Sequence, residues 1–330
     1  MSATLRRRWS DGARRDLAFG VLTLALFGLV AWRVPGFASA RNVAELFDDT
    51  AILILLALGQ MLVILVRGID LSVAANLALC GMLAAQVDRA FPGAGVAVAL
   101  ALSLGAGALL GAFNGVLVWK LRLPPIVVTL GTMSVYRGII YLLSHGTWVN
   151  EHEMSPEFVA FTRHTFLGLT LLAWLALGVA AAFVLALRHL RLARDLFAAG
   201  GNQQAAAYSG IDSGRMQFWA FTVCGAIAGV CGYLWVARFA VASTDVALGV
   251  ELQVIAACLI GGVAIAGGVG SAVGVVLGCL FIGIIANSLP RLGISPLWQM
   301  FINGAVILVA VLLSARRRES KRATLEAHGA

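Results

Sequence analysis

The sequence predicts an all-α polytopic membrane protein with about ten transmembrane helices, arranged as two inverted five-helix repeats. Hydrophobic residues make up 60% of the 330 residues and charged residues only 12%, which is more apolar surface than a soluble chain of this length can bury. The apolar residues form continuous runs rather than alternating ones, which argues against a β-barrel. Similar motifs also recur in the same order in both halves of the chain.

Ten apolar runs reach or approach the roughly 20 residues that a helix needs to cross a bilayer. The third and eighth runs are short and are interrupted by polar residues. We expect the spans at 17–34, 46–66, 71–88, 95–119, 125–143, 166–187, 217–237, 250–266, 270–288 and 297–314.

The distribution of basic residues predicts that both termini are cytoplasmic. With the N-terminus inside, the cytoplasmic segments hold 17 Lys and Arg residues, whereas the opposite side holds six and one, Arg137, falls inside a span. We therefore expect a basic cytoplasmic N-terminus over 1–16, a transmembrane domain over 17–315 and a basic cytoplasmic tail over 316–330. Because the net charge of +8 gathers at segment ends, it indicates contact with membrane lipid and not with nucleic acid.

Three motifs of the first half recur in the second. The stretch "GIDLSVAANLAL" at 68–79 matches "GVELQVIAACLI" at 249–260, and "LRLPP" at 121–125 matches "LGISP" at 292–296. Each half contains an odd number of spans, so the halves must insert in opposite orientations. Inverted repeats of this kind are typical of transporters, with the solute path between the repeats. The third match is a stripe of glycines four residues apart, at Gly107, Gly111 and Gly115 and at Gly270, Gly274 and Gly278, which predicts close helix packing.

Asp70 is an acid between two apolar runs, where a charge is costly. It could pair with Arg67, cap a helix that begins at Leu71 or Ser72, or contact the solute. Capping a break between the second and third spans is the interpretation we favour. A broken helix at membrane depth is tolerated where it lines a cavity or lies within protein, so Asp70, Ser72 and Asn76 are candidates for the solute path.

The longest cytoplasmic connection, 188–217, contains "GGNQQAAAYSG", which has the pattern of a short capped helix. Two glycines at 200 and 201 leave the chain free to turn, Asn202 can cap the helix, and Gly210 can end it in the left-handed conformation. Such a helix would present Gln204, Ala207 and Tyr208 to the cytoplasm. It predicts a rigid knob within about 196–214 that docks into a cytoplasmic partner.

These motifs carry a resemblance to a known family. "GGNQQAAAYSGI", "GIDLSVAANLAL" and "AACLIGGVAIAGGVGSAVGVVLG" resemble motifs of permease subunits of bacterial monosaccharide-importing ABC transporters, the ribose/xylose/arabinose group. The resemblance covers roughly residues 40–315. Within that group, "LPPIVVTLGTMSVYRGI" and "GTWVN" look most like rhamnose-import permeases.

The resemblance implies a permease subunit in the bacterial inner membrane. Its expected partners are cytoplasmic ABC ATPase subunits, a periplasmic sugar-binding protein and a second permease subunit, identical or homologous. ATP would be bound by the ATPase, with no cofactor in this chain. The residues expected to form the coupling loop to the ATPase are Gly200, Gly201, Asn202, Ala205, Ala206, Gly210 and Ile211.

Other function classes find less support in the residues. The sequence holds no phosphate-binding G-x-x-x-x-G-K-[ST] motif, no catalytic constellation and no metal-ligand spacing, so we expect neither an enzyme nor a metal site. An ion-coupled secondary sugar transporter is the alternative. It would need acids or histidines at mid-span, where the chain places Arg137 instead.

Overall fold

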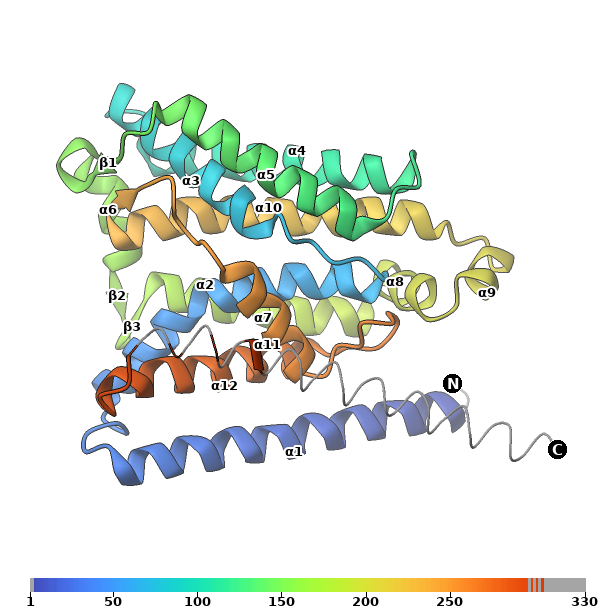
Figure 1. Cartoon of the computed structure of the whole chain (residues 1–330). Coiled ribbons are helices and arrows are strands. Elements are labelled where there is room, and N and C mark those ends of the chain that lie inside the picture. Colours follow the sequence, from blue (N-terminus) through green and yellow to red (C-terminus); the bar gives the residue numbers. More distant parts are fainter. Residues whose placement is uncertain (1–2, 296–297, 299–300, 302–303, 306–330) are drawn as a thin grey trace.

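The computed structural model describes residues 3–295, 298, 301 and 304–305, and they form a helical bundle around α2 and α10 (Figure 1). The helices are α1 (Ala3–Arg33), α2 (Ala40–Leu65), α3 (Val73–Ala90), α4 (Gly95–Trp119), α5 (Pro125–Ser144), the 3₁₀ turn η1 (Glu151–Glu153), α6 (Pro156–Arg163), α7 (Leu171–His189), α8 (Arg191–Gly201), α9 (Gln203–Tyr208), α10 (Ser213–Phe239), α11 (Val250–Ile260) and α12 (Ala272–Arg291).

The long helices lie along one direction, so the bundle has two ends (Figure 1). The α9 end carries α8 and α9. The β1 end carries four two-residue strands, which are a small exception to the all-α prediction. Strand β1 (Val149–Asn150) pairs antiparallel with β4 (Val241–Ala242), and β2 (Thr165–Phe166) pairs antiparallel with β3 (Leu169–Thr170).

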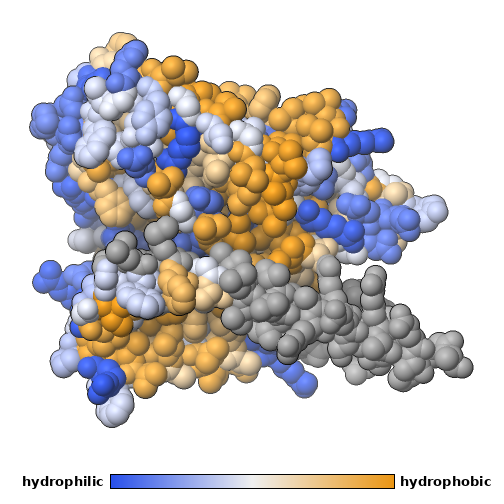
Figure 2. Space-filling model, viewed as in Figure 1, coloured by the Kyte–Doolittle hydropathy of each residue, from blue (hydrophilic) through white to orange (hydrophobic). Residues whose placement is uncertain are grey.

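Helix α2 is the buried axis of the bundle, whereas several other long helices face outward. In its most apolar stretch 83% of the α2 residues are buried, against 11% for α1 and 22% for α4. A helix that is apolar on all sides is buried either in protein or in lipid. Figure 2 shows hydrophobic side chains over the flank between the two ends and hydrophilic ones gathered toward the ends. The exposed apolar helices therefore suit a lipid environment.

Glycines bring α4 and α10 into backbone contact, as the stripe of small residues predicts. A Cβ atom added to Gly107 would lie 2.4 Å from the carbonyl oxygen of Gly225, and one added to Gly111 would lie 2.3 Å from the carbonyl oxygen of Phe221. Small residues at four-residue spacing allow this approach, and van der Waals packing rather than hydrophobic burial then holds the helices together in lipid.

Seven of the described helices are long and apolar enough to cross a membrane. They coincide with seven of the ten expected spans, and the span expected at 95–119 has the bounds of α4. The third span corresponds to α3, which is 18 residues long. The tenth, 297–314, lies almost entirely outside the described residues. The eighth, expected at 250–266, is wrong in length, because α11 ends at Ile260 and a glycine-rich loop follows.

We predict that Gly107→Ala destabilises the subunit by about 1–3 kcal/mol, because the added methyl group overpacks the contact with α10. Thermal unfolding of the detergent-solubilised protein measures the effect. Gly105→Ala is the matched control: that position has open space around its Cβ, and alanine favours the helix. Equal midpoints for the two variants would contradict the prediction.

Candidate functional site

The α9 knob, residues 202–211, consists of the six-residue helix α9 with a cap at each end. The side-chain oxygen of Asn202 accepts from the N–H groups of Gln204 and Ala205, each at 3.1 Å. At the other end Gly210 is left-handed with φ +77°, and Ile211 N–H donates to the carbonyl of Ala206 at 3.0 Å. This is the Schellman arrangement that stops a helix at a glycine. The predicted capped helix is confirmed.

The knob projects into solvent. Tyr208 is 93% exposed, and Gln204 and Ala207 are exposed as expected. Ala206 is the buried member of α9, with 3% exposure. A short helix with one buried alanine cannot hold its position by its own apolar surface, so its position depends on the segment that leads into it.

That segment does not turn freely at its glycines, which corrects the expectation for 200 and 201. Gly200 and Gly201 are the last residues of α8. A Cβ atom on Gly200 would lie 1.6 Å from the carbonyl oxygen of Leu65, at the end of α2. Glycine is required there because two backbones meet. Gly201, one residue later, has open space around its Cβ position.

Arg67 joins the end of α2 to the end of α8. Its Nε donates to the Gly200 carbonyl at 2.6 Å and its Nη2 to the Gly201 carbonyl at 2.9 Å. Arg67 does not pair with Asp70, which removes one of the alternatives raised by the sequence. Its φ of +66° is the left-handed conformation usually given to glycine at a helix end.

A glycine-rich loop, residues 261–271, completes this junction. The N–H of Gly268 donates to the Leu65 carbonyl at 2.9 Å, and a Cβ on Gly268 would meet the Cα of Gly201 at 2.4 Å. Helix α1 holds the other side of the loop, where Arg15 donates to the Gly262 carbonyl at 2.9 Å. The ends of α2 and α8 and this loop therefore form one contact, which we call the Leu65 junction.

Asp70 lies in the break between α2 and α3 and is 1% exposed. Its Oδ1 accepts from the N–H of Ser72 at 2.9 Å and from the Ser72 hydroxyl at 2.6 Å. Helix α3 begins one residue later, at Val73, and Ser72 makes no side-chain cap. Asp70 thus stabilises a local turn before the helix rather than capping its first-turn amides, which modifies the favoured interpretation.

The other two path candidates also have partners within the subunit. Asn114 donates to the Ser72 hydroxyl at 2.8 Å, and Asn76 donates to the Gly107 carbonyl at 3.2 Å. Ser72 and Asn76 are at most 2% exposed. The structure therefore brings Asp70, Ser72 and Asn76 together at the start of α3, which packs against α4, α5 and α10.

Arg137, in the middle of α5, contacts carbonyls. It donates to the Thr244 carbonyl at 3.1 Å and to the Val246 carbonyl at 2.8 Å. These carbonyls belong to the irregular segment 243–249 that leads into α11. Arg137 lies about 10 Å from the C-terminal end of α5, at 1.5 Å per helical residue. Irregular backbone at such a depth needs partners inside the protein, and Arg137 supplies them.

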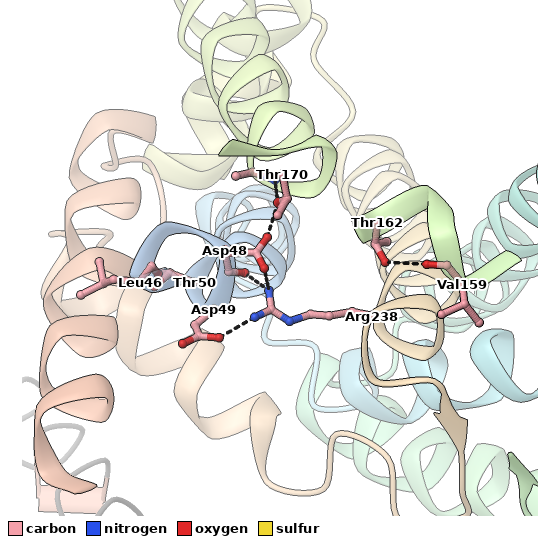
Figure 3. A network of polar contacts seen from close by, with 9 residues as sticks. Leu46, Asp48, Asp49, Thr50, Val159, Thr162, Thr170 and Arg238 are labelled. Atoms are coloured by element: carbon pink, nitrogen blue, oxygen red, sulfur yellow. Dashed lines mark hydrogen bonds and ion pairs between the residues drawn. The ribbon is translucent and has the colours of Figure 1, made fainter. Parts of the chain in front are cut away.

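A second cluster of charges, which is partly buried, was missed by reasoning from the sequence. Figure 3 shows Arg238 of α10 reaching between Asp48 and Asp49 of α2, while the Thr170 hydroxyl contacts Asp48. The Nη1 of Arg238 lies 2.8 Å from Asp48 Oδ2, and Nη2 pairs with Asp49. Part of the signal was available, because "FDDT" places two acids within the predicted span 46–66 and Arg238 directly follows the predicted span 217–237. Charges in membrane-spanning segments pair with one another.

Comparisons with known proteins agree with these features. Residues 42–311 match the family described as the permease component of branched-chain amino acid transport systems. The chain is 36% identical over 300 residues to the ribose import permease protein of Escherichia coli K12, covering 90% of this chain and 93% of that protein. It is 33% identical over 311 residues to the autoinducer 2 import system permease protein of Enterobacter sp. strain 638, covering 93% and 88%. No solved structure matches significantly.

The helices and the match together define a multi-pass permease of the bacterial inner membrane, a transporter component rather than an enzyme. The chain belongs to this permease family, in the branch that includes ABC importers of monosaccharides.

We predict that Arg67→Met accelerates amide hydrogen exchange in peptides covering 196–204 and 264–270. The substitution removes two hydrogen bonds from a charged donor, each worth about 1.5–3 kcal/mol, that tie α8 to α2. Hydrogen-exchange mass spectrometry of the solubilised protein measures the rates. Arg122→Met is the control, because Arg122 is exposed in the loop between α4 and α5; unchanged exchange in Arg67→Met would show that the junction does not depend on this side chain.

Proposed function

We propose that this chain is the membrane-spanning subunit of an importer that moves a monosaccharide across the inner membrane, powered by a separate cytoplasmic ATPase. The observation that carries the proposal is the α9 knob, which is exposed, capped at both ends and connected by backbone contacts to the buried axis α2. A rigid projection on a chain that lacks a nucleotide-binding motif suits a subunit that is driven by a partner ATPase.

The surface for the ATPase comprises the knob and the residues that fix it. Gly200 and Gly201 connect α8 to the Leu65 junction, while Asn202, Gly210 and Ile211 form the two caps. Ala206 anchors the underside and Ala205 lies on the exposed side with Tyr208. Displacement of the knob would therefore pass to α2 and to the loop 261–271 without first deforming a flexible linker.

We place the α9 end in the cytoplasm, with ten spans, both termini inside and two inverted repeats. Support comes from the excess of basic residues on that side and from the packing pattern. Helix α2 of the first half packs against α11 and α12 of the second half, and its counterpart α10 packs against α3 and α4 of the first half. The two halves therefore make equivalent contacts with each other. The basic segment 1–16 and the tail 316–330 then lie inside.

The β1 end would face the periplasm and receive the sugar-binding protein. It carries a cavity of about 750 Å³ lined in part by Glu151, His152 and Arg163. Arg163 pairs with Glu151 at 2.9 Å, and Arg89 pairs with Glu153 at 3.3 Å. The backbone N–H of Asn150 donates to Glu153 and lowers the pKa of that carboxyl, which keeps it charged on this surface. A second permease subunit, identical or homologous, would complete the pore.

Asp70, Ser72 and Asn76 border the deeper part of the proposed path. They gather polar groups where the chain breaks between α2 and α3, and irregular polar backbone at membrane depth is found beside cavities or within protein. Because all three are buried, solute would reach them only after a movement of the surrounding helices.

Within the monosaccharides we favour L-rhamnose. The support is the resemblance of "LPPIVVTLGTMSVYRGI" and "GTWVN" to rhamnose-import permeases, whereas the relatives that match are named for ribose and autoinducer 2. An ion-coupled secondary sugar transporter is the alternative mechanism.

We predict that Gly200→Ala lowers sugar uptake about tenfold or more in cells that contain the complete importer, while the protein still inserts in the membrane. The methyl group must displace α8 from the Leu65 carbonyl, at a cost of about 1–3 kcal/mol. Uptake of radiolabelled sugar and the membrane level of the subunit are the measurements. Gly201→Ala, which has room for the methyl group, should transport near the wild-type rate; equal loss in both variants would contradict the role of the junction.

We further predict that liposomes containing only this chain do not accumulate L-rhamnose, even with a proton or sodium gradient, and that adding the ATPase, binding protein and ATP restores accumulation. D-ribose serves as the comparison substrate. Accumulation by the chain alone would support the ion-coupled alternative. Accumulation of D-ribose in place of L-rhamnose would correct the substrate and leave the ATP-driven mechanism intact.

A further inference from the structure

A second cavity, of about 230 Å³, lies between α2, α10, α11 and α12. Its lining combines polar and aromatic side chains from all four helices, among them Asp49, Thr50, Trp235, Arg238, Gln253 and Asn287. Small-molecule sites are mostly apolar and aromatic with a few placed polar groups, and those for drug-sized ligands measure roughly 300–1,000 Å³. The smaller volume here suits a ligand the size of one sugar ring.

Residues outside this cavity hold its charged side chains in place. Arg238 is 16% exposed, pairs with Asp49, and is fixed by Asp48, which in turn contacts Thr170 of the α7 cap (Figure 3). The Asp49 side chain is 55% exposed. A carboxylate with free acceptor positions beside a fixed guanidinium can accept from one sugar hydroxyl while the guanidinium donates to the next.

One amide side chain in the lining has unused hydrogen-bonding capacity. The Oδ1 of Asn287 is buried without a hydrogen-bond partner among the described residues. Gln253 also lines the cavity and is partly exposed. A buried polar atom without a partner costs about 1–3 kcal/mol. A purely structural ion pair gives no reason for this oxygen to stay unpaired, whereas the hydroxyl of a bound ligand would donate a hydrogen bond to it.

The aromatic side of the cavity comes from α10. The rings of Trp235 and Phe239 lie 5.1 Å apart and tilted, and both contribute to the lining. Aromatic faces pack against the apolar C–H face of a sugar ring, while the hydroxyls at the ring edge need the polar groups opposite.

The cavity also lies where an incoming solute would arrive first. Asp49 is nine residues into α2 from the β1 end, about 14 Å along the helix. We propose that this cavity is an outer binding site for the transported monosaccharide, one that precedes the deeper cluster at Asp70. The proposal rests on the proposed function as a sugar permease.

Substituted-cysteine labelling of the complete importer in right-side-out membrane vesicles tests the site. Gln253→Cys is treated with a membrane-impermeant thiol reagent, with and without saturating L-rhamnose or D-ribose, whichever the wild type accumulates. The five native cysteines are free but buried, so they contribute little background. We expect the sugar to slow labelling at least fivefold. Leu252→Cys is the matched control, because Leu252 is 46% exposed but outside the cavity lining, and its labelling should not change.

Uptake kinetics supply the second readout. Asn287→Leu should raise the KM for uptake about fivefold, the effect of one lost hydrogen bond. Ser288→Ala, on the same helix but bonded to the Ile285 carbonyl, should not change KM. Normal uptake with no sugar protection at Gln253→Cys, or protection by non-transported mannitol as well, would overturn the site and leave the permease function standing. Absence of uptake of either sugar by the wild-type importer would instead overturn the proposed function and this site with it.

Discussion

The structure depends on the carbonyl of Leu65, where α2 ends. Helix α2 cannot satisfy its own last carbonyls, and an unpartnered one at membrane depth would cost several kcal/mol. The N–H of Gly268 supplies the partner, and Gly200 lies so close to the same oxygen that only glycine fits. The helix that is most buried in the bundle is thereby in direct backbone contact with the helix that carries the exposed knob.

Arg67 shows how the same end of α2 is tied to α8 through a side chain. It occupies the left-handed position where glycine is common, which costs a residue with a side chain about 1–3 kcal/mol. Its backbone N–H donates to the Ile64 carbonyl at the end of α2, and its guanidinium donates to the carbonyls of the last two residues of α8. The strained backbone directs the side chain across the junction, so the cost of the conformation is offset by two charge-assisted bonds.

Local features were predictable from the sequence, whereas contacts between distant segments were not. The bounds of α4 and both caps of α9 follow from apolar length, Asn202 and Gly210, because these signals act within a few residues. The early end of α11 was missed because Gly262 takes its left-handed turn within the stretch 254–266, which is apolar throughout. The partners of Arg137 and Arg238 lie more than 100 residues away in the sequence. The sequence predicts that a charge within the membrane has a partner, but it does not identify the partner.

Two of the glycine interfaces in the bundle differ in the segments that adjoin them. The α4–α10 contact joins two long helices over several turns, so sliding them would break many close contacts at once. Helix α11 has 11 residues and packs on α12 through Gly274 and Gly278, and irregular chain lies on both sides of it. Irregular segments absorb changes in φ and ψ that helices cannot. In the proposed importer, a displacement of the α9 knob would pass to the end of α2 and to the loop 261–271. Of the two helices attached to that loop, α11 is the one that can move with least disruption.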